Sequence, residues 1–149
     1  MNEATATRVD FYLLPTAEPL ARLQFACKLA DKALASGRRL HVLTGDRSEC
    51  EMLGRLLWTY GDISFRPHAI TDAGNTDYPI TLGCTADSLT GGSALLNLAP
   101  DVPDHYALFD QIAEIVDENP DIKIRGREHY RLYRSYGCDL QHHALGQTS

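Results

Sequence analysis

The chain has 149 residues, of which 44% are hydrophobic and 23% are charged, and its formal net charge is −6. This length fits a single domain spanning residues 1–149, and the composition is that of an ordinary folded protein rather than a disordered one. The acidic balance argues against direct high-affinity binding of nucleic acid, and no apolar run approaches the roughly 20 residues that cross a bilayer.

The first half of the chain alternates strand and helix patterns. The compact apolar run Val9–Leu14 predicts a strand, and the segment after it predicts an amphipathic helix that ends at Gly37. The apolar stripe of that helix consists of Leu20, Leu23, Cys27, Ala30 and Leu34. Arg39–Thr44 predicts a second strand. This order favours a βαβ unit and a mostly parallel sheet.

A second helix is expected directly after the second strand. Ser48 with Glu51 three residues later forms a capping-box pattern, which satisfies free backbone groups at a helix start. The expected buried stripe of this helix consists of Met52, Leu53, Leu56 and Leu57.

The middle of the chain is less regular. We expect Tyr60–Thr76 to be mostly loop, and Tyr78–Cys84 and Ala94–Leu98 to be further strands. Asp104 is positioned to cap a third long helix that ends at Pro120. The apolar residues of that helix would be Tyr106, Phe109, Ile112, Ile115 and Val116.

A final helix is expected from about Asp121 to Tyr136, with Gly137 as its stop. Gly126 weakens its first turns, so its start could be as late as Arg127. A polar segment should follow, and we expect residues 1–8 and 146–149 to be frayed. The N-terminal residues lack the basic and apolar regions of a signal peptide, so we expect a cytoplasmic protein.

Motifs for chemistry are missing from the sequence. No G-x-G-x-x-G, G-x-x-x-x-G-K-[ST] or G-x-S-x-G pattern occurs, so the fold should be Rossmann-like without a nucleotide-binding loop. The four cysteines are widely spaced and are interpreted as reduced thiols: Cys27, Cys50, Cys84 and Cys138. We expect no catalytic residue, no cofactor and no metal.

Several polar residues have a functional and an ordinary interpretation. Cys138 with the pair His142–His143 could bind a metal, but a polar C-terminal segment is the preferred interpretation. His41 is expected to be a satisfied, partly buried strand residue. Three acids are expected on the solvated face of the third helix: Glu114, Asp117 and Glu118.

The unusual feature of this acidic chain is a basic helix, residues 122–137. Five of the fourteen lysines and arginines of the chain fall in these sixteen residues. At helical spacing, five side chains share one broad face: Lys123, Arg127, Tyr130, Arg131 and Arg134. Guanidinium groups beside an aromatic ring suit an acidic peptide with an apolar end or a terminal carboxylate. A nucleic-acid site and an inert solvated face are the alternatives.

Five short motifs together resemble the family of DNA polymerase III chi subunits. They are F-Y-L-L (Phe11–Leu14), A-x-x-S-G-R-R-L (Ala33–Leu40), L-x-x-x-L-W ending at Trp58, S-F-x-P-H (Ser64–His68) and R-E-x-Y-x-x-Y-R-x-x-G (Arg127–Gly137). The resemblance spans Phe11 to Leu140 and implies a single three-layer α/β/α domain.

The resemblance also implies partners. It implies a non-catalytic subunit that binds the psi subunit, through which it joins the clamp loader, and the acidic C-terminal tail of single-strand DNA-binding protein. The tail-binding motif of the family falls on Arg127, Tyr130 and Arg131, and helical spacing adds Lys123 and Arg134. Phe65 and Trp58 would contact psi or another partner, although both rings could equally lie in the core. The alternative is a small α/β nucleotide- or nucleic-acid-binding domain that uses the basic helix.

Overall fold

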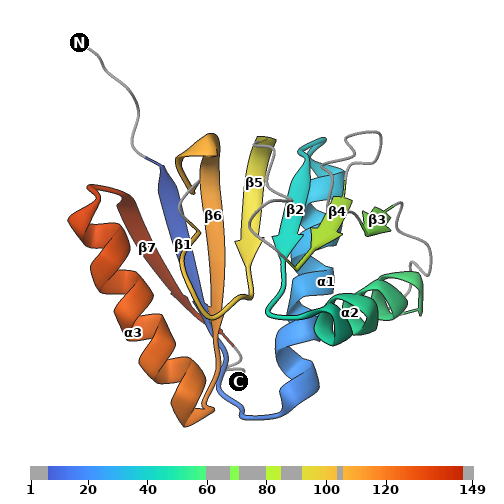
Figure 1. Ribbon diagram of the computed structural model, residues 1–149, viewed down its shortest axis with the longest axis horizontal. Coiled ribbons are helices and arrows are strands. Elements are labelled where there is room, and N and C mark those ends of the chain that lie inside the picture. Colours follow the sequence, from blue (N-terminus) through green and yellow to red (C-terminus); the bar gives the residue numbers. More distant parts are fainter. Residues whose placement is uncertain (1–6, 60–67, 71–79, 85–91, 104–105, 146–149) are drawn as a thin grey trace.

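The computed structural model describes residues 7–59, 68–70, 80–84, 92–103 and 106–145. These residues form a seven-stranded sheet of order β3-β4-β2-β5-β6-β1-β7, in which all six neighbouring pairs run parallel (Figure 1). The strands are β1 (Arg8–Leu13), β2 (Leu40–Leu43), β3 (His68–Ile70), β4 (Ile80–Gly83), β5 (Gly92–Asn97), β6 (Phe109–Val116) and β7 (Asp139–Ala144). The helices are α1 (Pro19–Ala35), α2 (Arg47–Thr59) and α3 (Pro120–Ser135), with a short 3-10 helix η2 (Tyr106–Leu108).

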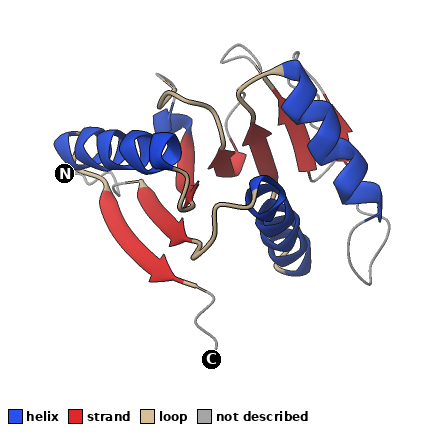
Figure 2. Cartoon of the chain, turned by 90° about the horizontal axis from the view of Figure 1, so that it is seen from below, coloured by secondary structure: helices blue, strands red, loops and turns tan. Residues whose placement is uncertain are grey.

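Helices cover both faces of the sheet (Figure 2). Successive residues of a strand point to opposite faces, and the two core clusters follow this alternation. Leu95 belongs to the cluster that contains Phe11 and Tyr133 of α3. Leu96 belongs to the other cluster, with Cys27 of α1 and Leu53 of α2. The expected three-layer α/β/α architecture with a mostly parallel sheet is therefore confirmed, while the likeness to a Rossmann fold is loose.

The first two helices begin and end close to the expected positions, but the cap of α2 differs. Gly37 follows α1 with a φ of 72°, as a C-terminal glycine should. At the start of α2, Asp46 rather than Ser48 is the capping residue, because its Oδ1 accepts the Glu49 N–H at 2.8 Å. The carboxylate of Glu49 in turn accepts the Gly45 N–H at 2.9 Å. The expected capping box was therefore placed two residues too late.

The expected buried stripe of α2 is also only partly right. Leu53 and Leu57 are buried, but the side chain of Met52 is 38% exposed. Cys50 is fully buried instead, so the core face of α2 contains Cys50, Leu53 and Leu57 and excludes Met52.

The largest error of the sequence interpretation concerns β6. The expected third helix is a strand, Phe109–Val116, preceded by the short η2. β6 lies between β5 and β1, and its Ile112 and Ile115 belong to different core clusters. A strand that is covered on both faces loses its alternation of apolar and polar residues, so its apolar spacing imitated a helix.

The expected loop between residues 60 and 76 contains a strand as well. β3 occupies His68–Ile70 and pairs with β4 at one edge of the sheet. The other residues of that expected loop lie outside the described residues, as does Asp104.

The final helix is confirmed, with a sharper start than expected. Pro120 begins α3 instead of ending a preceding helix, and the Asn119 side chain accepts the Asp121 N–H at 2.9 Å. The helix continues through Gly126 and ends before Gly137, whose φ is 82°. The polar segment that follows is an edge strand, β7, paired in parallel with β1. Within the described ranges, no helix combines the length and the apolar character needed to span a membrane.

Candidate functional site

A groove of about 500 Å³ lies between α3 and the strands β1 and β7. All five residues that helical spacing placed on one face of α3 line it: Lys123, Arg127, Tyr130, Arg131 and Arg134. The remaining lining residues are Phe11, Leu13, Val116, Gly126 and His142. The expected common face is therefore confirmed as a geometric feature.

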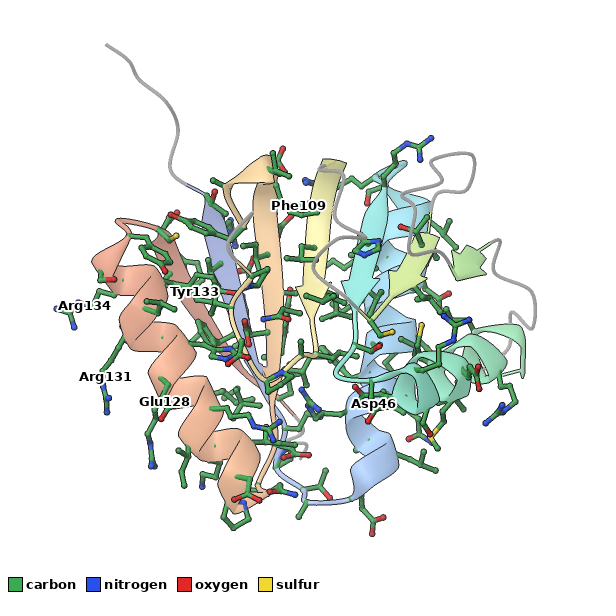
Figure 3. All side chains as sticks on the ribbon, viewed as in Figure 1. Asp46, Phe109, Glu128, Arg131, Tyr133 and Arg134 are labelled. Carbon is green, nitrogen blue, oxygen red and sulfur yellow. The ribbon has the colours of Figure 1, made fainter. Side chains whose placement is uncertain are left out.

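Cationic side chains form the rim of this groove. Arg127, Arg131 and Arg134 are exposed, and none of them forms an ion pair with another described residue. Figure 3 shows Arg131 and Arg134 projecting outward from α3. Lys123 differs, because its Nζ lies 3.1 Å from the Glu118 carboxylate. The three arginines are thus available to an anionic ligand.

The floor of the groove is apolar and aromatic. Phe11 of β1 contacts Tyr130 edge to face, with ring centroids 5.7 Å apart. The floor can come this close to α3 because position 126 is glycine. A Cβ at Gly126 would lie 2.7 Å from Cγ2 of Val116, closer than two non-bonded carbon atoms normally approach. The groove therefore offers an apolar surface directly beneath the arginines.

A buried polar network fixes α3 against the sheet behind the groove. The carboxylate of Glu114 on β6 lies 2.9 Å from His129 Nδ1 and accepts the Tyr133 hydroxyl at 2.7 Å. It also accepts the Asn97 side-chain amide at 3.0 Å, and His129 Nε2 lies 2.8 Å from the Pro100 carbonyl. Each buried polar group of this network thus has a partner, as a stable interior requires.

The burial of Glu114 and Asp117 overturns the expectation that they lie on a solvated helix face. Both residues are buried, at 4% and 3% exposure, and only Glu118 is exposed as expected. The sequence did contain a weak signal: His129 and Tyr133 are one helical turn apart, on the side of α3 away from Arg127, Arg131 and Arg134.

Both partners of Glu114 on α3 have shifted pKa values. Burial by itself lowers the pKa of His129, but the hydrogen bond and negative charge of Glu114, with the Pro100 carbonyl, outweigh it and hold the pKa above 6.5. Both ring nitrogens face oxygen atoms of Glu114 and Pro100, an arrangement that favours the doubly protonated imidazolium. Burial, together with the charge of Glu114, raises the pKa of Tyr133 well above 10.0.

The three residues of the possible metal site point to different places. His142 lines the groove, whereas His143 Nε2 lies 2.8 Å from the buried Asp10 carboxylate. Successive strand residues point to opposite faces of the sheet, so the imidazoles of His142 and His143 cannot bind the same metal ion. Cys138 packs against the cluster that contains Phe109. Among the described residues, no group of three or more potential ligands assembles.

The remaining expectations are settled by burial. His41 is buried, its Nδ1 lies 2.6 Å from the Thr81 hydroxyl, and burial lowers its pKa to about 4, as suits a neutral core histidine. Cys27 is buried in the core, and none of the four cysteines forms a disulfide. The side chain of Trp58 and the whole of Phe65 lie outside the described residues.

The geometry of the groove defines what it can bind. Three exposed guanidinium groups can each form paired hydrogen bonds to a carboxylate. The apolar floor beneath them can take up an apolar side chain. The buried network behind α3 fixes the position of the arginines relative to this floor. An anionic chain with an apolar end satisfies both halves at once.

The comparison with known proteins agrees across the chain. The model of the family described as "DNA polymerase III chi subunit, HolC" matches residues 6–141. A DNA polymerase III subunit chi of Pseudomonas aeruginosa is 36% identical over 139 residues, covering 93% of this chain and 97% of the relative. Proteins of the same name from Haemophilus influenzae and Escherichia coli are each 26% identical, covering 95% and 87% of this chain and 99% and 92% of the relative, respectively.

Proposed function

The chain belongs to the DNA polymerase III chi subunit family, and we propose that it is a non-catalytic subunit whose groove holds the acidic C-terminal tail of single-strand DNA-binding protein. The psi subunit would be its second partner and would connect it to the clamp loader. In this proposal the protein works in the cytoplasm and tethers the replication machinery to coated lagging-strand DNA.

The observation that carries the proposal is the combination of free arginines and an apolar floor in one groove. The family resemblance implies that this acidic tail ends in phenylalanine. Such a tail has carboxylates for Arg127, Arg131 and Arg134, and a ring for the floor beside Tyr130. Bidentate guanidinium–carboxylate pairs fix the orientation of the peptide, and packing of its ring on the floor buries apolar surface.

Tethering does not require a strong single contact. Single-strand DNA-binding protein offers several identical tails per oligomer, so a modest affinity for one tail becomes firm attachment through effective concentration. Because charge pairs contribute to the contact, the attachment should weaken as ionic strength rises.

The contact with psi is assigned to Trp58 and Phe65 on the family resemblance. Trp58 belongs to the last turn of α2, and Phe65 lies in the segment between α2 and β3. Co-purification of psi with the wild-type chain, and its loss on Trp58→Ala or Phe65→Ala with the tail affinity unchanged, would support this assignment. Retention of psi by both variants would place the psi contact elsewhere.

The tail contact is tested with a fluorescently labelled acidic peptide that ends in phenylalanine, titrated by anisotropy. Saturable, salt-sensitive binding is expected, together with its loss when the terminal phenylalanine is deleted. Equal binding of the shortened peptide would mean that the affinity comes from the charges alone and that the apolar floor does not contribute.

The alternative function is tested with the same assay. A single-stranded oligonucleotide that binds as tightly as the peptide, in the absence of any partner protein, would favour direct nucleic-acid binding by α3. The net charge of −6 argues against that outcome. A saturable thermal stabilisation by a nucleotide would favour the nucleotide-binding alternative.

A further inference from the structure

The groove has a second wall, which comes from β7 rather than from the basic helix. His142 of β7 lines the groove and lies beside Phe11 of β1 in the strand register. No helical pattern in the sequence points to this residue, because β7 joins α3 only through the tertiary fold. Its neighbour His143 faces the other side of the sheet, where Asp10 holds it.

Aromatic neighbours hold the His142 ring in place. The ring stacks on Phe11, with centroids 5.7 Å apart and planes at 23°, and its centroid lies 5.0 Å from that of Tyr130. His142 is nevertheless exposed, and its ring nitrogens form no hydrogen bond with another described residue. The packing therefore fixes the ring and leaves its polar edge available to a ligand.

The described residues that face His142 include no carboxylate. From α3 the facing groups are Tyr130 and four cations: Lys123, Arg127, Arg131 and Arg134. From β1 they are Phe11 and Leu13, and the neighbours of His142 on the same face of β7 are Leu140 and Ala144, which carry no charge. Asp10 lies on the opposite face, and Glu118 is paired with Lys123. If His142 is protonated, the negatively charged group that pairs with it would therefore come from the bound ligand.

We propose that His142 contacts the acidic peptide end in the groove and makes the affinity for that peptide depend on pH between about 5.5 and 8. This inference rests on the proposed function, since it concerns a second wall of the same site. Histidine is the side chain whose charge ordinarily changes in this range, and an imidazolium donates a stronger hydrogen bond to a carboxylate than neutral imidazole does. Affinity therefore rises as pH falls, while the carboxylates of the peptide stay ionised.

The experiment measures the anisotropy of the labelled acidic peptide ending in phenylalanine at constant ionic strength from pH 5.5 to 8. The wild-type chain should bind roughly three- to tenfold more tightly at pH 5.5 than at pH 8, the range for one partly screened charge-assisted hydrogen bond. His142→Phe retains a ring on Phe11 and should bind with little change across this range. His142→Gln should lose both the ring packing and the pH dependence.

The matched control is His143→Gln, a change of the same kind at the next residue on the opposite face of β7. It should leave the pH dependence of peptide binding as in the wild type. His129 is intact in all these variants, so any effect of its titration on α3 is common to them.

The outcomes separate the two proposals. If the wild-type chain fails to bind the peptide at every pH, the proposed function fails. If it binds but His142→Phe shows the same rise in affinity at low pH, the groove remains the binding site and the role of His142 is overturned.

Discussion

His129 of α3 and Glu114 of β6 lie 2.9 Å apart, and the exposed fractions of their side chains are only 7% and 6%. This pair joins the inner face of the helix to the centre of the sheet, while Arg127, Arg131 and Arg134 of the same helix line the groove. The position of the cationic rim therefore depends on a buried ion pair that contacts no ligand. In Figure 3, Tyr133, which binds the same carboxylate, lies between α3 and the sheet.

Replacing His129 by alanine should destabilise the protein by about 3 kcal/mol. The reason is that Glu114 would remain buried without its cationic partner, which costs more than the pair itself contributes. Chemical denaturation of both proteins at pH 6 measures the difference. A loss below about 1 kcal/mol would mean that water or a shift of α3 replaces the imidazolium.

The same pair predicts a dependence of stability on pH. The pKa of His129 is raised in the folded state, so its contribution is complete below about pH 6.5 and is lost as pH rises through the raised pKa. The free energy of unfolding of the wild-type chain should therefore fall as pH rises above about 6.5. In His129→Gln this decline should be smaller, and an equal decline in both proteins would assign it to another group.

Gly126→Ala should destabilise the protein by about 1–2 kcal/mol, although alanine is the better helix former. The added Cβ would lie 2.7 Å from the β-branched side chain of Val116, and this overpacking outweighs the roughly 1 kcal/mol gained in helix propensity. In a Val116→Ala background the same substitution should be neutral or stabilising. Urea denaturation of the four proteins of this cycle measures the coupling, and additive effects would contradict the predicted contact.

Arg127→Ala should weaken binding of the acidic peptide by about 1–2 kcal/mol, as expected for a hydrogen-bonded charge pair that is partly screened by solvent. Arg125→Ala is the matched control, because Arg125 lies on the same helix and is exposed but does not line the groove. Titration of the labelled peptide compares the two variants. Equal losses would show that the net charge of α3, rather than the groove, determines affinity.

Asp46→Ala should cost about 1 kcal/mol of stability, because the Asp46 side chain caps α2. Ser48→Ala should change stability by less than about 0.5 kcal/mol, since Ser48 is an exposed residue within the helix. Thermal unfolding distinguishes them, and the reverse order would restore the capping box expected from the sequence.

The sequence by itself determined the features that depend on neighbours along the chain. The basic face of α3 could be predicted because a helix places residues three and four apart on one side, whatever the rest of the fold does. The N-terminal βαβ order was visible for a similar reason, since β1 and β2 are short apolar runs separated by an amphipathic helix.

Only the tertiary structure decided what lies opposite that basic face. β6 is buried on both sides and β7 is a polar edge strand, so neither shows the alternation that identifies a strand in a sequence. The sequence pattern consequently predicts Glu114 on a solvated helix and His142 in a polar C-terminal segment. Their partners are distant in sequence, as Phe11 is from His142, and such contacts form only when the parallel sheet brings separate strands together.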